Sequence, residues 1–174
     1  MIKSFSLVLC GLITLSASAL AAAATEVKVT DVHLCCKACV NGVNKATADV
    51  KGVKVEADQK TKTVTITAET DEAAAKAVQA MADAGFNGKV EGGKFEMKYE
   101  GKVPAGKVKR LVLNVGHSGC GSCNSAIKKA IEKVDGVEGI GAKAKDVKVV
   151  VEGDFEAAAV VTALREAGFG AKVE

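Results

Sequence analysis

The sequence HLCCKAC at residues 33–39 recurs as HSGCGSC at residues 117–123, so the pattern H-x-x-C-x-x-C occurs twice, 84 residues apart. The chain has only 2 histidines, and each lies three residues before the first cysteine of a C-x-x-C pair. Two cysteines with this spacing can turn both sulfurs towards one atom when the first lies in a loop and the second in the first turn of a helix. Such thiolates bind soft metal ions. The repeat therefore predicts a metal-binding loop present in two copies.

The repeat extends well beyond the cysteines. Apolar residues alternate at 27–29 and at 111–113, before each loop, which is typical of a half-buried strand. After each loop, at 39–50 and at 123–134, the apolar residues fall on one helical face. Each cysteine loop is therefore expected to join a strand to a helix.

The rest of each unit also matches. A predicted hairpin at 53–66 or 137–151 is followed by a second helix, which we expect to be capped by Asp71 or Asp154. That helix ends at a Gly-Phe pair, and a last short strand follows. The order strand, helix, strand, strand, helix, strand predicts an α+β fold of two tandem ferredoxin-like βαββαβ domains. Each domain would be a four-stranded antiparallel sheet with two helices on one face.

These elements set the domain boundaries. The first domain is predicted at 25–100 and the second at 107–174, with a linker at 101–106. Apolar residues alternate at 94–99 after a glycine pair that favours a tight turn. This pattern predicts an extra edge strand on the first domain.

Residues 1–24 are typical of a signal peptide. Lys3 provides a positive start, residues 5–20 form an apolar core too short to span a bilayer, and small residues at the end offer cleavage sites. The mature chain is therefore expected to be periplasmic or secreted. The alternative is a lipoprotein acylated at Cys10, although Leu9 stands where lipoprotein signals usually have a small residue.

Composition argues against nucleic-acid binding. The formal net charge is +3, residues 107–110 form the only dense basic run, and the chain has 0 Trp. No later segment has the unbroken apolar length of a transmembrane helix, so no membrane span is expected after signal cleavage.

The loops and the Gly-aromatic ends resemble the heavy-metal-associated domain family. This family includes copper chaperones, the amino-terminal domains of copper-transporting ATPases and periplasmic mercury-binding proteins. Its loop reads Gly-Met-Thr-Cys-x-x-Cys, and the resemblance implies that Cys36, Cys39, Cys120 and Cys123 bind copper(I), zinc(II), mercury(II) or a similar ion. It also implies a metal-transporting ATPase or another metal-accepting protein as the partner. Because each unit of the repeat has its own cysteine pair, about one ion per domain is expected.

The chain departs from the family loop at positions that bear on the metal. His33 and His117 replace the glycine, and Cys35 replaces the threonine of the first loop. Copper(I) or mercury(II) suits two thiolates, whereas zinc(II) wants four ligands, so a contribution from the histidines would favour zinc(II). Cys35 is either an extra ligand or a spare thiol, and we favour the spare thiol.

Two other functions remain open. Five cysteines follow the signal peptide, and oxidising compartments favour disulfides, so a metal-free domain pair with oxidised cysteines is one alternative. A thiol-disulfide oxidoreductase is the other, although a thioredoxin fold needs a strand and a helix before its C-x-x-C motif, and here only a strand precedes it. The preferred interpretation is a metal-binding protein that is not an enzyme.

Overall fold

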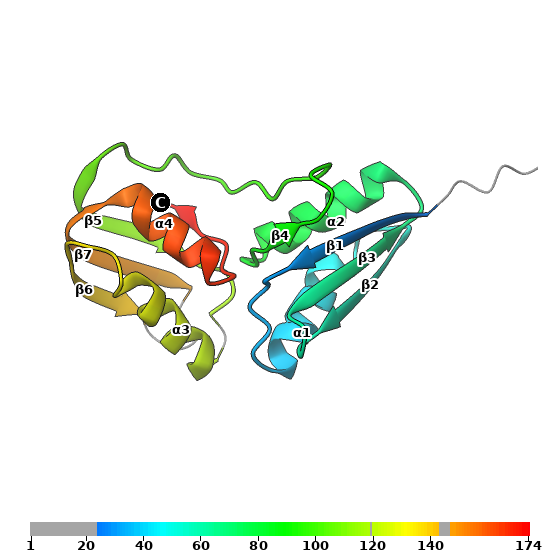
Figure 1. Cartoon of the computed structure of the whole chain (residues 1–174), viewed down its shortest axis with the longest axis horizontal. Coiled ribbons are helices and arrows are strands. Elements are labelled where there is room, and N and C mark those ends of the chain that lie inside the picture. The colour runs from blue at the N-terminus through cyan, green and yellow to red at the C-terminus, as the bar shows by residue number, and fades with distance from the viewer. Residues whose placement is uncertain (1–23, 119, 143–146) are drawn as a thin grey trace, which may run out of the picture.

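The computed structural model describes residues 24–118, 120–142 and 147–174. Its described residues form two units with the same order of elements (Figure 1). Unit one contains β1 (Thr25–Thr30), α1 (Lys37–Thr47), β2 (Val53–Asp58), β3 (Thr63–Ala68), α2 (Asp71–Asp83) and β4 (Lys89–Val90). Unit two contains β5 (Lys107–Asn114), α3 (Gly121–Ile131), β6 (Val137–Ala142), β7 (Lys148–Glu156), α4 (Ala157–Glu166) and β8 (Lys172–Val173).

Each unit has one four-stranded antiparallel sheet. The strand order is β2-β3-β1-β4 in unit one and β6-β7-β5-β8 in unit two, so the two orders correspond strand for strand. Both helices of a unit lie on the same face of its sheet (Figure 1). The predicted pair of tandem ferredoxin-like folds is confirmed. The predicted signal peptide at 1–24 lies almost wholly outside the described residues.

The cores follow from the apolar periodicity. In unit one, Val27 and Val29 of β1 are buried on alternate positions and meet Val43 of α1 in the same hydrophobic core. In unit two, Leu111 and Leu113 of β5 occupy the corresponding buried positions. Alternate strand residues point to opposite faces of a sheet. In each unit the helices therefore cover the face to which these buried β1 or β5 side chains point.

The second helices are not capped as predicted. Thr70 is the N-cap of α2, and its side chain accepts a hydrogen bond from the backbone N–H of Ala73 at 3.1 Å. Asp71 therefore lies one residue inside the helix. In unit two, β7 continues to Glu156, which is the N-cap of α4 without a side-chain cap, so Asp154 lies within the strand.

The extra edge strand predicted at 94–99 is wrong. These residues form an extended strap outside any strand, which Figure 1 shows passing over α2 before it crosses to β5. The reason is that the Gln79 side chain of α2 hydrogen-bonds to the backbone N–H and carbonyl of Lys98, which a neighbouring strand would otherwise bind. Its amide donates to the carbonyl of Lys98 at 2.8 Å, and its oxygen accepts from the N–H of Lys98 at 3.2 Å. The alternating apolar residues Phe95 and Met97 pack against the core from this strap.

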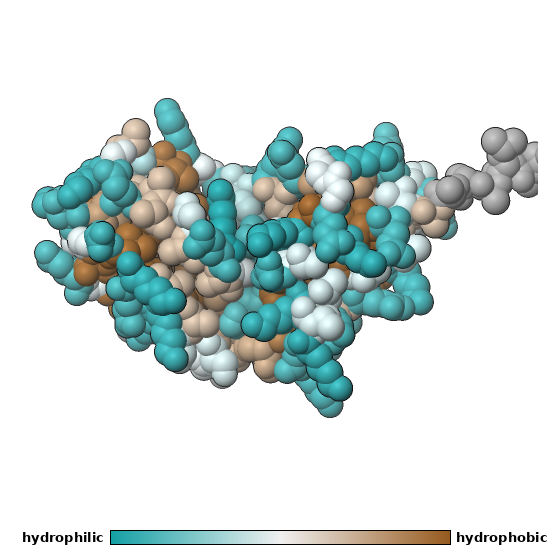
Figure 2. All heavy atoms as spheres, in the orientation of Figure 1, coloured by the Kyte–Doolittle hydropathy of each residue, from teal (hydrophilic) through white to brown (hydrophobic). Residues whose placement is uncertain are grey.

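The surface is mostly polar. Figure 2 shows polar side chains spread over both units and separating the apolar groups on that face. Val147, 40% exposed, is the only exposed large hydrophobic side chain among the described residues. Within the same ranges, no helix is long and apolar enough to cross a membrane.

Candidate metal centre

The two cysteine loops lie at equivalent places in the two units. Cys36 and Cys120 are the N-caps of α1 and α3, and both have extended backbone conformations. Cys39 and Cys123 follow in the first helical turn and are buried. This is the loop-then-helix placement that the C-x-x-C spacing predicts, and it puts the sulfurs at the positive end of each helix.

The units contact each other through their Gly-Phe turns. Phe86 and Phe169 form an isolated antiparallel β-bridge between the turn after α2 and the turn after α4. Two backbone hydrogen bonds accompany the bridge, from Asn87 N–H to the Gly168 carbonyl at 3.1 Å and from Gly170 N–H to the Gly85 carbonyl at 2.9 Å. The contact is reciprocal, because each unit presents the same turn to the other.

Glycine is required in both turns. Gly85 and Gly168 each have a φ of +84°, which side-chain-bearing residues rarely adopt. A Cβ on Gly85 would lie 2.6 Å from the backbone nitrogens of Gly116 and His117, and a Cβ on Gly168 would lie 2.5 Å from that of His33. Each Gly-Phe turn therefore fits closely under the cysteine loop of the opposite unit.

The two histidines take part in this contact. The His33 ring lies 4.3 Å from the ring of Phe169, and the His117 ring lies 4.1 Å from that of Phe86, measured between centroids. Each histidine thus packs on the Gly-Phe turn of the other unit. The sequence left open whether these histidines bind a metal ion or not, and it did not predict this contact, because nothing in it shows that the units face each other.

Burial lowers the pKa of both imidazoles. For His117, burial and then the neighbouring His33 lower the pKa to about 4. For His33, burial and then Lys62 lower the pKa, against an opposing hydrogen bond to the backbone of Ala167. Both rings are therefore neutral near pH 7. The Nε2 atom of His117 lies 3.9 Å from the sulfur of Cys123, whereas that of His33 is buried and has no hydrogen-bond partner within the described ranges.

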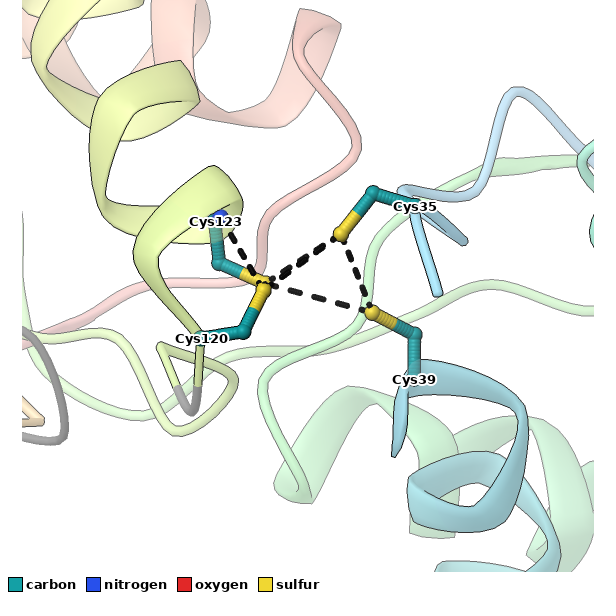
Figure 3. A group of neighbouring side chains, drawn as sticks. All are labelled: Cys35, Cys39, Cys120 and Cys123. Atoms are coloured by element: carbon teal, nitrogen blue, oxygen red, sulfur yellow. Dashed lines mark hydrogen bonds between the residues drawn. The ribbon is translucent and has the colours of Figure 1, made fainter. Parts of the chain in front are cut away.

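The contact between the units brings four sulfurs together. The Sγ atoms of Cys35, Cys39, Cys120 and Cys123 all lie within 4.8 Å of one another, and Figure 3 shows the two pairs facing each other from opposite units. We call these four residues the sulfur group. Cys35 Sγ lies 3.4, 3.5 and 3.7 Å from the sulfurs of Cys39, Cys120 and Cys123, and the Cys39–Cys123 distance is 3.9 Å.

These distances match a tetrahedral metal site. With zinc–sulfur bonds of about 2.3 Å, the sulfurs of a tetrahedron lie about 3.8 Å apart. A linear two-sulfur site with the same bond length would need about 4.6 Å between its sulfurs. Cys120 and Cys123, at 2.8 Å, are closer than either geometry requires and would have to separate by about 1 Å to share one ion.

The thiols of the sulfur group differ in acidity. Burial acts to raise the pKa of Cys120, but hydrogen bonds to its sulfur, above all from Cys123, outweigh this effect and lower the pKa to about 7. Burial, followed by the hydrogen bond with Cys120, raises the pKa of Cys123 to about 12, and burial also raises the pKa of Cys35. Cys120 is thus the most acidic of these three thiols. An ion that binds all four sulfurs must displace the remaining protons.

The predicted ligands are only partly brought together. Cys39, Cys120 and Cys123 belong to the sulfur group, and Cys35, interpreted from the sequence as a spare thiol, belongs to it as well. Cys36 lies outside the group, although its sulfur is 3.6 Å from that of Cys39. The sequence gives one sign of this substitution. Because Cys35 is adjacent to Cys36, unit one has a second cysteine that could pair with Cys39.

Comparison with known proteins supports this description. Residues 105–170 match the sequence model of the heavy-metal-associated domain family. Among curated proteins, no significant match was found. The family match therefore lies within unit two, and unit one has the same strand order and cysteine spacing, so the predicted resemblance is confirmed.

Three solved structures are similar to this chain. Oxidized MerP from Ralstonia metallidurans CH34 shares 28% identity, with a TM-score of 0.33, over 38% of this chain and 96% of that chain. The N-terminal domain of ZntA in its Zn(II) form shares 27% identity, with a TM-score of 0.36, over 38% of this chain and 92% of that chain. The N-terminal soluble domains of Bacillus subtilis CopA share 16% identity, with a TM-score of 0.35, over 88% of this chain and 95% of that chain.

Proposed function

We propose that this chain, whose second unit matches the heavy-metal-associated domain family, is an exported protein that captures, buffers or transfers a soft or borderline transition metal ion. The observation that carries the proposal is the sulfur group, in which four cysteine sulfurs from two units lie within 4.8 Å of one another. Thiolates at this spacing form a ligand set for such an ion. In this function the chain performs no chemical conversion of its own.

The ligand set favours an ion that takes four tetrahedral ligands over an ion that is satisfied by two. Four thiolates at close to tetrahedral spacing suit zinc(II), whereas copper(I) and mercury(II) are satisfied by two. The neutral histidines leave the charge of the site to the sulfurs, so four thiolates with a divalent ion carry a net charge of −2. Zinc(II) is therefore our first candidate, with copper(I) and mercury(II) as competitors.

The arrangement also bears on stoichiometry. The sequence predicts about one ion per domain, because each unit has its own C-x-x-C pair. The sulfur group instead takes two sulfurs from each unit, which favours one ion shared between the units. Titration decides between these two stoichiometries.

Export and partners follow from the sequence. The signal-peptide pattern at 1–24 supports a periplasmic or secreted location. A metal-transporting ATPase or another metal-accepting protein is the partner we propose, because a protein that only binds an ion must receive it from, or deliver it to, another molecule. Export can be tested by comparing the mass of the mature protein with that of the full chain.

The central test is a metal titration of the full mature chain under reducing conditions. We expect about one equivalent of zinc(II), measured by competition with a chromophoric chelator and by native mass spectrometry. Alkylation of the zinc-loaded protein should spare Cys35, Cys39, Cys120 and Cys123 and modify Cys36. Two equivalents, with Cys36 protected, would instead support one ion per unit. Absence of binding to zinc(II), copper(I) and mercury(II) would refute the proposal.

One observation favours a second candidate, a thiol-disulfide function. The sulfurs of Cys120 and Cys123 are 2.8 Å apart, and the pKa of Cys120 is lowered to about 7, a combination that favours attack on a disulfide. An oxidoreductase would reduce the disulfides of a model substrate such as insulin, and a metal-free oxidised pair would contain one free thiol and no metal. Both outcomes are read from the same preparation.

A further inference from the structure

We propose that Cys36 is the exchange ligand of the sulfur group, the thiol through which an ion enters and leaves while Cys35 completes the final site. This inference rests on the proposed metal-binding function. It describes how the ion enters and leaves the site, which the four ligands of the closed site do not explain. It concerns the fifth sulfur of the cluster, which lies beside the sulfur group without belonging to it.

The first observation is where Cys36 lies. Its sulfur is 3.6 Å from that of Cys39, and Cys36 is also among the neighbours that lower the pKa of Cys120, so it lies beside members of the sulfur group from both units. Cys36 is half-buried, whereas Cys39 is fully buried. An ion held by Cys36 would already be within reach of sulfurs from both units.

The second observation is how differently the two N-cap cysteines are held. Cys120 Sγ accepts a hydrogen bond from the backbone N–H of Cys123 at 3.3 Å, which fixes it at the start of α3. Cys36 is the N-cap of α1 but makes no such side-chain bond, and the N–H of Cys39 binds its carbonyl instead, at 3.0 Å. The Cys36 side chain can therefore rotate without breaking a helix cap.

The third observation is that Cys35 already occupies the fourth ligand place. Its sulfur lies within 3.7 Å of Cys39, Cys120 and Cys123, and its backbone carbonyl accepts a hydrogen bond from the Gln59 side chain at 3.0 Å. Cys35 is thus the better placed of the two adjacent thiols for a closed site. Neighbouring thiols, one inside the sulfur group and one at its edge, allow one ligand to replace the other without the ion leaving the protein.

The exchange is a ligand substitution without a redox step. An incoming divalent ion on a small chelator binds the sulfur of Cys36, whose thiol proton passes to solvent, and the chelator loses one metal bond. The sulfurs of Cys39, Cys120 and Cys123 then replace the remaining chelator bonds, each protonated thiol among them gives its proton to solvent, and the chelator leaves. As Cys35 binds and releases its proton, the Cys36–metal bond breaks and Cys36 takes up a proton. Release runs the same steps in reverse.

The test compares Cys36→Ser with Cys35→Ser in the full mature chain, with Cys36→Ala as a variant that has neither thiol nor hydroxyl cap. The probe is zinc(II) on a chromophoric chelator. Equilibrium competition gives the affinity, and stopped-flow mixing gives the rates of capture and release. Both Cys36 variants should keep zinc affinity within about threefold but exchange zinc roughly tenfold or more slowly. Cys35→Ser should lose roughly 10- to 100-fold in affinity, as expected for a disturbed metal site.

The outcomes separate this inference from the function on which it rests. If the Cys36 variants exchange zinc at the wild-type rate, or lose as much affinity as Cys35→Ser, Cys36 is not an exchange ligand, although the proposed function stands. If wild-type protein binds no zinc(II), copper(I) or mercury(II), the proposed function and this inference both fail. Circular dichroism of each variant establishes that it is folded.

Discussion

Unit one places Cys35 and Cys39 in the sulfur group, whereas unit two places Cys120 and Cys123 there. The backbone contact between the units is nevertheless reciprocal, because each Gly-Phe turn lies under the histidine of the opposite loop. A symmetric contact thus holds an asymmetric set of ligands. The difference comes from one position, since unit one has Cys35 where unit two has a glycine at 119.

This comparison separates two requirements for the metal site. The ligands must be the right type, which depends on the cysteines. The two loops must also face each other, which depends on the Gly-Phe turns and the histidines, none of which belongs to the sulfur group. Variants in the contact should therefore weaken metal binding without removing any sulfur.

The largest effect is expected for Gly85→Ala. The new Cβ would lie 2.6 Å from backbone atoms of unit two, so the units must separate. Gly92→Ala is the matched control, because Gly92 has a φ of +83° and open space around it. Both changes strain a left-handed backbone by about 1–2 kcal/mol, but only Gly85→Ala should lower zinc affinity, by roughly 100-fold, or about 2.8 kcal/mol.

Chelator competition and small-angle scattering would measure this difference. An expanded Gly85→Ala protein with weak zinc binding would support the shared site, and Gly168→Ala should behave in the same way because it lies in the equivalent turn. Wild-type zinc affinity in both turn variants would show that the sulfur group does not need the contact between the units.

The second effect concerns His117, which is 9% exposed and packs on Phe86. His117→Ala removes this packing and should lower zinc affinity roughly tenfold, as expected when a group that supports metal ligands is lost. His117→Phe retains an aromatic ring but no nitrogen ligand, so it should keep most of the affinity if the role of the ring is packing. A loss as large in the phenylalanine variant as in the alanine variant would identify His117 as a ligand.

The sequence predicts most of the fold because the repeat is local. Apolar periodicity defines the strands and helices within each unit, and Gly85 and Gly168 have the positive φ that their positions after the helices suggest. The strap at 94–99 was mispredicted because its alternation reflects packing on α2, and an alternating pattern does not reveal which surface it faces. Propensity likewise could not show that Thr70, rather than Asp71, caps α2.

The site could be predicted only in part, for a physical reason. C-x-x-C spacing indicates which sulfurs can meet within one unit, and Cys39 and Cys123 lie where it places them. The spacing contains no information on how two units pack together. The choice of Cys35 over Cys36 is made by that packing, because only Cys35 reaches both sulfurs of the opposite C-x-x-C pair within 3.7 Å.

A smaller effect is expected for the strap. The Tyr99 hydroxyl donates to the carbonyl of Phe86 at 2.9 Å and lies 2.7 Å from the side-chain oxygen of Asn87. Tyr99→Phe should lower the free energy of unfolding by about 1 kcal/mol, because it removes a partly buried hydrogen bond. Zinc affinity should change little, since Gly85 and Gly168 are untouched. Urea unfolding of the metal-free protein measures the first quantity, and a hundredfold loss of zinc affinity would show that the strap itself holds the units together.

The smallest effect is expected at the N-termini of the second helices, α2 and α4, where the two units differ. The Thr70 side chain caps α2 through its bond from Ala73, whereas Glu156 begins α4 without a side-chain cap. Thr70→Ala should therefore destabilise the protein by about 1 kcal/mol, a typical value for loss of an N-cap. Glu156→Ala should have almost no effect on the free energy of unfolding, because no cap is lost. Equal destabilisation by the two substitutions in urea unfolding would contradict this difference, and unchanged zinc affinity in both would place these helix starts outside the metal site.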